Sequence, residues 1–310
     1  MTAAQAWDVS ELQGSPKRHR REAIVRGTVF SAAALSILIS VLIVYALLFE
    51  ALSFMREVDW STTWGQLGWF PRRNIFDLPT ILVATFSVTA IAMLVATPLG
   101  LAAAIYLSEY ANPRARRVLK PILEILAGIP SVVLGYFALR FIAPNIVSNL
   151  FSGAAPANLA AAGIGVGFLT IPLIASISED ALAAVPRSLR EASSGLGARK
   201  ISTTMRVVLP AALSGLTAAF IVAVSRAIGE TMVVFIAGGA ADSALRSFDP
   251  LEPGLTMTAA MASVASGTDN VAGEGPAFQS LFFVGLLLFA MTLVLNLIAD
   301  RFVRRFRQEY

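Results

Sequence analysis

Two ionisable residues lie deep inside an apolar stretch of the chain, residues 211–238. Arg226 and Glu230 are four residues apart, so a continuous helix would place both on one face. A guanidinium is permanently charged and offers a planar fork of N–H donors, which suits an oxyanion. The carboxylate would orient the guanidinium and compensate its charge in the absence of an anion. We therefore expect Arg226 and Glu230 to line a pathway for an anionic substrate. The alternative is a closed ion pair that only joins helices.

The segment 179–210 is a second candidate site, because it alternates apolar and charged residues as a simple connector would not need to do. Pro186 suits the first turn of a helix, and Gly195 and Gly197 suit its end. Its apolar residues recur at helical spacing: Leu189, Ala192 and Leu196. The pattern predicts a short helix across one face of a membrane, followed by a second short helix. Such a helix could insert into a groove of a partner protein.

The amino-acid composition indicates the class of protein that carries these candidate sites. Of 310 residues, 56% are hydrophobic and only 14% are charged, whereas soluble domains average about 25% charged residues. The chain has no cysteine and a single histidine, His19, in its polar N-terminal part. These counts exclude disulfides, thiolate metal sites, cysteine nucleophiles and a Ser-His-Asp hydrolase. The net charge of +4 fits basic residues that fix membrane topology, and we expect no nucleic-acid partner.

Six apolar segments are long enough to cross a bilayer as helices, and none alternates with period two as barrel strands do. They are residues 27–49, 80–107, 121–143, 159–178, 211–238 and 277–299. The expected fold class is therefore all-α, a polytopic membrane protein with six transmembrane helices in contact with lipid. Pro98, Pro130 and Pro172 are expected kinks. Gly163 and Gly167 are spaced for close helix packing.

The distribution of basic residues predicts the orientation. With the N-terminus inside, the inner segments hold 18 Lys and Arg residues and the outer segments hold 4, a strong positive-inside signal. We expect cytoplasmic tails at 1–26 and 301–310, with a first transmembrane helix at 27–49. The outer loop 50–79 carries tryptophans that suit an interfacial aromatic belt or a short interfacial helix, and the outer loop 239–276 is acidic. Both loops are expected to be solvated loops with membrane anchors, and the alternative is a docking surface for an external partner. Within the third apolar segment, Glu124 is expected at the inner interface or paired with Lys120, and Arg140 near the outer end.

The inner segment resembles a known motif. The order Glu191-Ala192-Ser193, three residues, Gly197, nine residues, then Val207-Val208-Leu209-Pro210 is similar to the EAA loop of ABC importer permeases. That signature reads E-A-A-x3-G-x9-I-x-L-P, and this chain departs from it at Ser193 and Val207. The resemblance implies that the loop at 179–210 docks into a separate ATPase subunit. It assigns this coupling role to Glu191, Ala192, Gly197, Leu209 and Pro210.

No GxxxxGK[ST] phosphate loop occurs in the chain. We therefore expect this subunit to bind no cofactor and to be non-catalytic. ATP and magnesium would be held by the partner ATPase.

Four further segments resemble the phosphate-specific ABC importer permeases, and the fourth favours the PstC type over the PstA type. They are LSEYA (107–111), LKPILEILAGIPSVVLGYFAL (119–139), SEDALAAVP (178–186) and SRAIGETMVV (225–234). The resemblance covers about residues 80–300 and implies a type I ABC importer permease fold in the cytoplasmic membrane. It implies a PstA-type permease, two PstB-type ATPase subunits and an external PstS-type phosphate-binding protein as partners. It also implicates the polar residues of the fifth span, here Arg226 and Glu230, in moving phosphate.

Three other functions stay open on the sequence. The substrate could be another oxyanion such as sulfate or molybdate, because the EAA loop does not distinguish between these anions. A secondary transporter or channel also fits six spans with intramembrane charges, although no inverted repeat is evident. A non-transporting membrane scaffold or sensor is the third alternative.

Overall fold

The computed structural model describes residues 16–60, 63–65, 68–239, 245–266 and 275–306, and the chain divides into two units, 1–49 and 50–310. The first unit holds most of helix α1 (Pro16–Glu57), which starts before the predicted span 27–49 and extends beyond it. Its most apolar window is 0% buried. The side chain of His19 lies outside the described residues.

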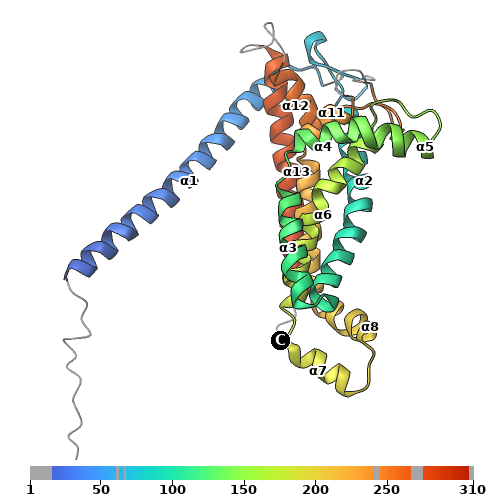
Figure 1. Cartoon of the computed structure of the whole chain (residues 1–310). Coiled ribbons are helices and arrows are strands. Elements are labelled where there is room, and N and C mark those ends of the chain that lie inside the picture. Colours follow the sequence, from blue (N-terminus) through green and yellow to red (C-terminus); the bar gives the residue numbers. More distant parts are fainter. Residues whose placement is uncertain (1–15, 61–62, 66–67, 240–244, 267–274, 307–310) are drawn as a thin grey trace, which may run out of the picture. The chain divides into compact units, whose positions relative to one another are not determined.

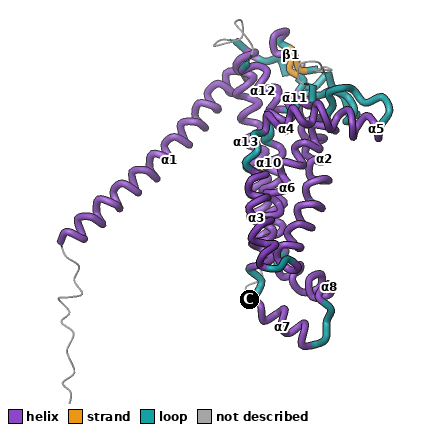
Figure 2. Tube along the Cα trace, in the orientation of Figure 1, coloured by secondary structure: helices purple, strands orange, loops and turns teal. Residues whose placement is uncertain are grey.

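The second unit is a helical bundle with a small antiparallel hairpin, as Figures 1 and 2 show. Its α-helices are α2 (Leu78–Ile105), α3 (Pro113–Ala127), α4 (Ser131–Phe137), α5 (Ser148–Leu150), α6 (Leu159–Ala183), α7 (Arg187–Gly195), α8 (Lys200–Thr203), α9 (Leu209–Ala211), α10 (Leu213–Ile228), α11 (Met232–Ala237), α12 (Met257–Ala265) and α13 (Pro276–Phe306). Three π-helical segments continue helices, namely η3 (Tyr106–Tyr110), η4 (Ala138–Val147) and η5 (Thr204–Val208). Helices α7 and α8 lie at one end of the bundle, and the hairpin lies at the other.

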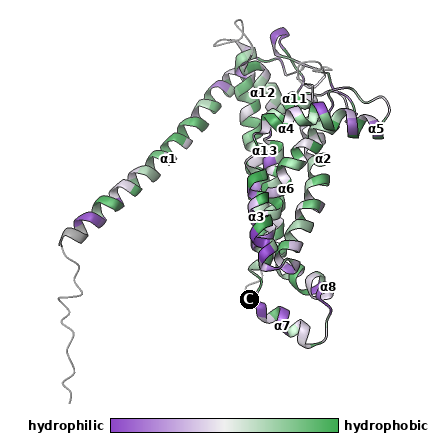
Figure 3. Cartoon of the chain, in the orientation of Figure 1, coloured by the Kyte–Doolittle hydropathy of each residue, from purple (hydrophilic) through white to green (hydrophobic). Residues whose placement is uncertain are grey.

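Among the described residues, five helices are long and apolar enough to cross a membrane, or six if the bent pair Lys200–Ala211 and Leu213–Ile228 forms one span. Figure 3 shows hydrophobic residues along these helices, whereas hydrophilic residues gather toward α7 and α8. The third span differs from its predicted range, 121–143. Helix α3 ends at Ala127, and the candidate span is Ser131–Leu150. Gly128 and Pro130 account for the interruption, because both residues disfavour a continuing helix.

Close packing of α2 against α6 forms the centre of the bundle. A Cβ atom added at Gly163 would lie 2.7 Å from the Cβ of Ile91, and one added at Gly167 would lie 3.0 Å from the Cβ of Val95. These distances confirm the predicted small-residue face, which lets the two helix backbones approach each other. Two of the predicted kink prolines lie inside these helices: Pro98 in α2 and Pro172 in α6.

The loop after α1 folds into a hairpin of β1 (Trp69–Phe70) and β2 (Ile75–Phe76), joined by the short 3-10 segment η2 (Pro71–Arg73). The expectation that all its tryptophans form an interfacial belt is wrong for Trp69. This side chain is only 2% exposed and packs against the Phe76 ring at 5.6 Å, whereas Trp60 and Trp64 are exposed.

A buried ion pair holds this end of the bundle together. Asp77 precedes α2 and is fully buried, and it accepts from the Arg246 guanidinium at 2.5 Å. Arg246 belongs to the predicted acidic loop 239–276. The acidic residues Asp242, Asp269 and Glu274 of that loop lie outside the described residues.

The α2–α6 contact generates a stability prediction. Gly163→Ala should destabilise the chain by about 1–3 kcal/mol, because the added methyl group overpacks against Ile91. Thermal unfolding of the detergent-purified chain measures this effect. Gly27→Ala is the matched control, because Gly27 lies inside α1 with no atom within 4 Å of its added Cβ. Equal thermal midpoints for the two variants would contradict the close contact.

Candidate functional site

The fifth span, predicted over 211–238, is interrupted where its charged residues lie. Helix α10 ends at Ile228, and α11 begins at Met232. Between them, Glu230 accepts at its backbone carbonyl from the Thr258 hydroxyl at 2.7 Å. Its carboxylate Oε1 accepts from the Val233 N–H at 3.4 Å, at the start of α11. The break follows from the sequence, since glycine at 229 is a poor helix former and an acidic residue stabilises a helix N-terminus.

Arg226 and Glu230 come together across this break. The Arg226 Nη2 lies 3.8 Å from the Glu230 Oε2, too long for a hydrogen bond. Their exposures differ sharply, because the Glu230 side chain is 4% exposed and that of Arg226 is 55% exposed. Within the part of the chain that the structure describes, the Arg226 guanidinium makes no hydrogen bond. Its N–H donors therefore have no hydrogen-bond acceptor among these residues, and Glu230 supplies a nearby compensating charge.

Buried threonines hold the helix break in its apolar surroundings. Thr258 and Thr256 lie at the start of α12, and their hydroxyls are 3.2 Å apart. The Thr85 hydroxyl of α2 accepts from the Met257 N–H at 3.0 Å. These bonds join α2 and α12 to the break beside Glu230. The amino-acid sequence does not single out these three threonines, because isolated hydroxyl residues in apolar helices follow no distinctive spacing.

The predicted coupling loop lies at one end of the bundle. Helix α7 ends at Gly195, and Gly197 adopts a φ of 77°, so both predicted helix-ending glycines are confirmed. Glu191 and Ala192 are exposed on α7. Leu196 was predicted on the apolar face of this helix, but it follows the helix and is 90% exposed. An exposed leucine at the tip of a loop suits a surface that a partner covers.

The end of the EAA-like segment forms a bend at the start of the fifth span. Leu209 is half-buried and Pro210 is exposed, both on α9. The axes of the Lys200–Ala211 segment and the Leu213–Ile228 helix differ by 72°. Pro210 thus lies where the loop turns into the membrane-spanning helix that carries Arg226.

A cluster of charges joins α3 to α6 near this loop. Glu179 is 1% exposed and binds Arg116 and the Lys120 Nζ, the latter at 2.7 Å. Lys120 also contacts the exposed Asp180 at 3.2 Å. The hydrogen bond to Glu179 raises the pKa of Lys120 above its ordinary value. Lys120 is therefore paired with carboxylates of α6. Glu124 is exposed on α3.

Arg140 lies in the middle of the structure's third candidate span and not near its outer end, because that span is Ser131–Leu150. Its Nε donates to the Tyr136 hydroxyl at 3.4 Å. The side chain is exposed, like that of Arg226, but it has an aromatic neighbour in place of a carboxylate.

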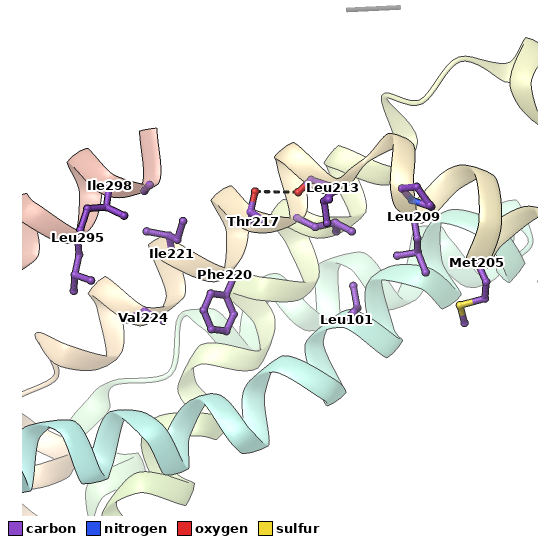
Figure 4. Close-up of a pocket in the computed structure, with 13 residues that line it drawn as sticks. Leu101, Met205, Leu209, Leu213, Thr217, Phe220, Ile221, Val224, Leu295 and Ile298 are labelled. Carbon is purple, nitrogen blue, oxygen red and sulfur yellow. Dashed lines mark hydrogen bonds between the residues drawn. The ribbon is translucent and has the colours of Figure 1, made fainter. Parts of the chain in front are cut away.

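An apolar groove lies along the other face of α10, and Figure 4 shows it. Its volume is about 750 Å³, and its walls come from α2, α9, α10 and α13 together with Met205. Thr217 supplies the one hydroxyl in the lining and donates it to carbonyls of its own helix. The groove therefore offers no charged group or free donor to an anion, and Arg226 is absent from its walls.

The sequence matches a family model described as the inner membrane component of binding-protein-dependent transport systems, over residues 96–308. A probable ABC transporter permease, YqgH of Bacillus subtilis, is 30% identical over 94% of each chain. The phosphate transport permease PstC of Mesorhizobium japonicum is 32% identical over 76% of each chain. PstC 1 of Mycobacterium tuberculosis is 32% identical over 73% of this chain and 71% of its own.

Solved structures agree on the fold. The inward-facing MetNI methionine ABC transporter aligns with a TM-score of 0.55 at 21% identity, over 74% of this chain and 94% of its own. A bacterial ABC transporter for the import of alginate aligns with a TM-score of 0.61 at 15% identity, over 94% of this chain and 100% of its own. The fold is that of type I ABC importer permeases, which are non-catalytic multi-pass membrane subunits. This chain belongs to the family of inner membrane components of binding-protein-dependent transport systems.

Proposed function

We propose that this chain is the PstC-type permease subunit of an ATP-driven importer of inorganic phosphate. The observation that carries the proposal is the free, half-exposed guanidinium of Arg226 beside the buried carboxylate of Glu230. The PstC names of several relatives favour phosphate over sulfate or molybdate.

The exposure of Arg226 indicates where the substrate would pass. Arg226 lies in the last turn of α10, where the fifth span is interrupted, and a charged side chain within a membrane span is unfavourable against lipid. Val222, one turn before Arg226, is exposed on the same side of α10. We infer that a second permease subunit of PstA type covers this face and that the two subunits enclose a polar pathway. Phosphate would bind the Arg226 guanidinium there. It would dissociate when the pathway closes to the outside and opens to the cytoplasm.

Phosphate uptake against the membrane potential requires an energy source. Moving one elementary charge against 100 mV costs about 2.3 kcal/mol, so a phosphate dianion costs about twice that on entering a negative-inside cell. Two PstB-type ATPase subunits would supply this energy, and a PstS-type binding protein would deliver phosphate from outside. The coupling contact on this chain would be Glu191, Ala192 and Gly197 of the α7 loop, with Leu209 and Pro210 at its junction with the span.

The positive-inside pattern places the α7 loop in the cytoplasm in this proposal, together with both termini. The Asp77–Arg246 end of the bundle then faces outward, toward the binding protein.

Labelled-phosphate uptake tests the proposed pathway in cells that lack this chain. Wild type should restore uptake that resists excess sulfate and molybdate. Arg226→Gln should lower uptake at least about tenfold, because a charge-assisted hydrogen bond contributes about 1.5–3 kcal/mol. Arg140→Gln is the matched control, since it also removes an exposed arginine from a candidate span, and it should retain uptake.

Equal uptake with wild type and Arg226→Gln would remove Arg226 from the pathway. Loss of the assembled complex in Arg226→Gln would make the Arg226–Glu230 pair structural. Restoration of sulfate uptake in place of phosphate uptake would identify a different oxyanion permease.

The coupling loop has a separate test in Gly197→Val. The φ of 77° at Gly197 costs a residue with a Cβ about 1–2 kcal/mol, so the turn after α7 should shift. Phosphate uptake should fall while ATP hydrolysis by the assembled complex persists. Gly195→Val is the control, because Gly195 has open space and no positive φ. Normal uptake by Gly197→Val, with the ATPase still bound, would show that this loop is not the coupling site.

A further inference from the structure

One side chain of helix α7, that of Arg190, contacts the helical bundle. Arg190 precedes Glu191 and points toward the bundle, with a side chain 23% exposed. Its Nη2 donates to the Glu109 Oε1 at 2.7 Å, and its Nε donates to the Oε2 at 3.3 Å. This is a bidentate arginine–carboxylate pair, the geometry that combines charge with a fixed orientation.

The same guanidinium also binds the end of α6. Arg190 Nη1 donates to the Val185 carbonyl at 2.6 Å, and Nη2 donates to the Leu182 carbonyl at 2.8 Å. Leu182 lies in the last turn of α6 and Val185 follows that helix, so the guanidinium opposes the negative end of the helix dipole. One side chain of α7 therefore bonds to the ends of two membrane-spanning helices, α6 and the α2–η3 helix that carries Glu109.

Glu109 is buried and paired with Arg190. Its side chain is 7% exposed, and the Ser108 hydroxyl also lies 3.1 Å from its Oε1. A carboxylate this deeply buried is costly without its cation, so removing one partner of such a pair is strongly destabilising. The ion pair therefore resists separation of α7 from α2.

Two further contacts fasten the other side of the loop. The Ser193 hydroxyl of α7 lies 2.8 Å from the Thr203 hydroxyl of α8. The Lys200 Nζ at the start of α8 lies 4.9 Å from the ring centre of Tyr110, one residue after Glu109. Ser193 stands where the EAA signature has its second alanine, so this departure adds a bond within the loop. The loop thus holds η3 through Arg190 and through Lys200.

We propose that Arg190 and Glu109 are positioning residues that make α7 move as one body with the inner ends of α2 and α6. A displacement of α7 by the ATPase then reaches α2, which packs against α10, the helix of Arg226. The inference rests on the proposed coupling role of α7 and adds the link between that helix and the span with the anion site. Without the ion pair, α7 would tilt on its flanking turns and the displacement would not reach α10.

The test uses the assembled transporter in liposomes, with its second permease, ATPase subunits and binding protein. The chain contains no cysteine, so spin labels attach only at introduced sites on this subunit. Ser194→Cys on α7 and Leu99→Cys on α2 provide two exposed positions. The distance distribution between the two labels should be narrow and the same with and without ATP. Glu109→Gln should broaden it and lower phosphate moved per ATP hydrolysed at least about fivefold, the lower range of allosteric coupling.

Two additional variants make the result decisive. Arg190→Lys keeps the charge, but a single ammonium cannot make both the bidentate pair with Glu109 and the two carbonyl bonds. It should therefore broaden the distance distribution, but less than Glu109→Gln does. Asp180→Asn is the matched control, because it removes an ion pair at the same end of the bundle that does not involve α7. It should leave both readouts unchanged.

A narrow, wild-type distribution in Glu109→Gln or Arg190→Lys would overturn the inference. If Glu109→Gln does not assemble, Arg190→Lys supplies the same readout. The proposed function fails differently, since a wild-type complex that hydrolyses ATP but moves no phosphate would refute the substrate while the label distances still report on the link.

Discussion

The hydrocarbon interior of a membrane contains no water for backbone N–H and C=O groups, so every interruption of a spanning helix must be satisfied by the protein itself. The break between α10 and α11 meets this constraint through the Thr258 hydroxyl and the Glu230 carboxylate. These groups come from two different segments of the chain. The break can therefore exist only when α12 is packed beside it, and the polar site around Arg226 depends on that packing.

Buried charged side chains must likewise find their partners within the protein. Three carboxylates at the ends of the bundle are at most 7% exposed, and each has at least one cation within hydrogen-bond distance: Asp77, Glu109 and Glu179. Arg226 and Glu230 differ from them, because their charged groups are 3.8 Å apart and the guanidinium is half-exposed. The closed pairs fix helices to one another, whereas this open pair leaves a cation available. In the proposed function, the closed pairs hold the frame of the bundle and the Arg226 guanidinium binds the anion.

Packing of α2 against α6 joins the two ends of this frame. Gly163 and Gly167 allow the close approach of the helices near one end, and Arg190 ties the other ends of the same helices to α7. The Thr85 hydroxyl of α2 also accepts a hydrogen bond from the Met257 N–H at the start of α12, beside the helix break. One rigid helix pair therefore contacts both the proposed coupling loop and the proposed anion site.

The sequence by itself determined the membrane class, most of the spans, the family and the position of the α7 turn. These properties depend on hydropathy, composition and spacing over short stretches. It misplaced the third span, because Gly128 and Pro130 interrupt an otherwise apolar run, and it did not locate the break in the fifth span. Only the tertiary structure decided the partners of the buried charges. Glu109 and Arg190 are 81 residues apart and Arg116 and Glu179 are 63 apart, and such pairings arise from helix packing that no local pattern encodes.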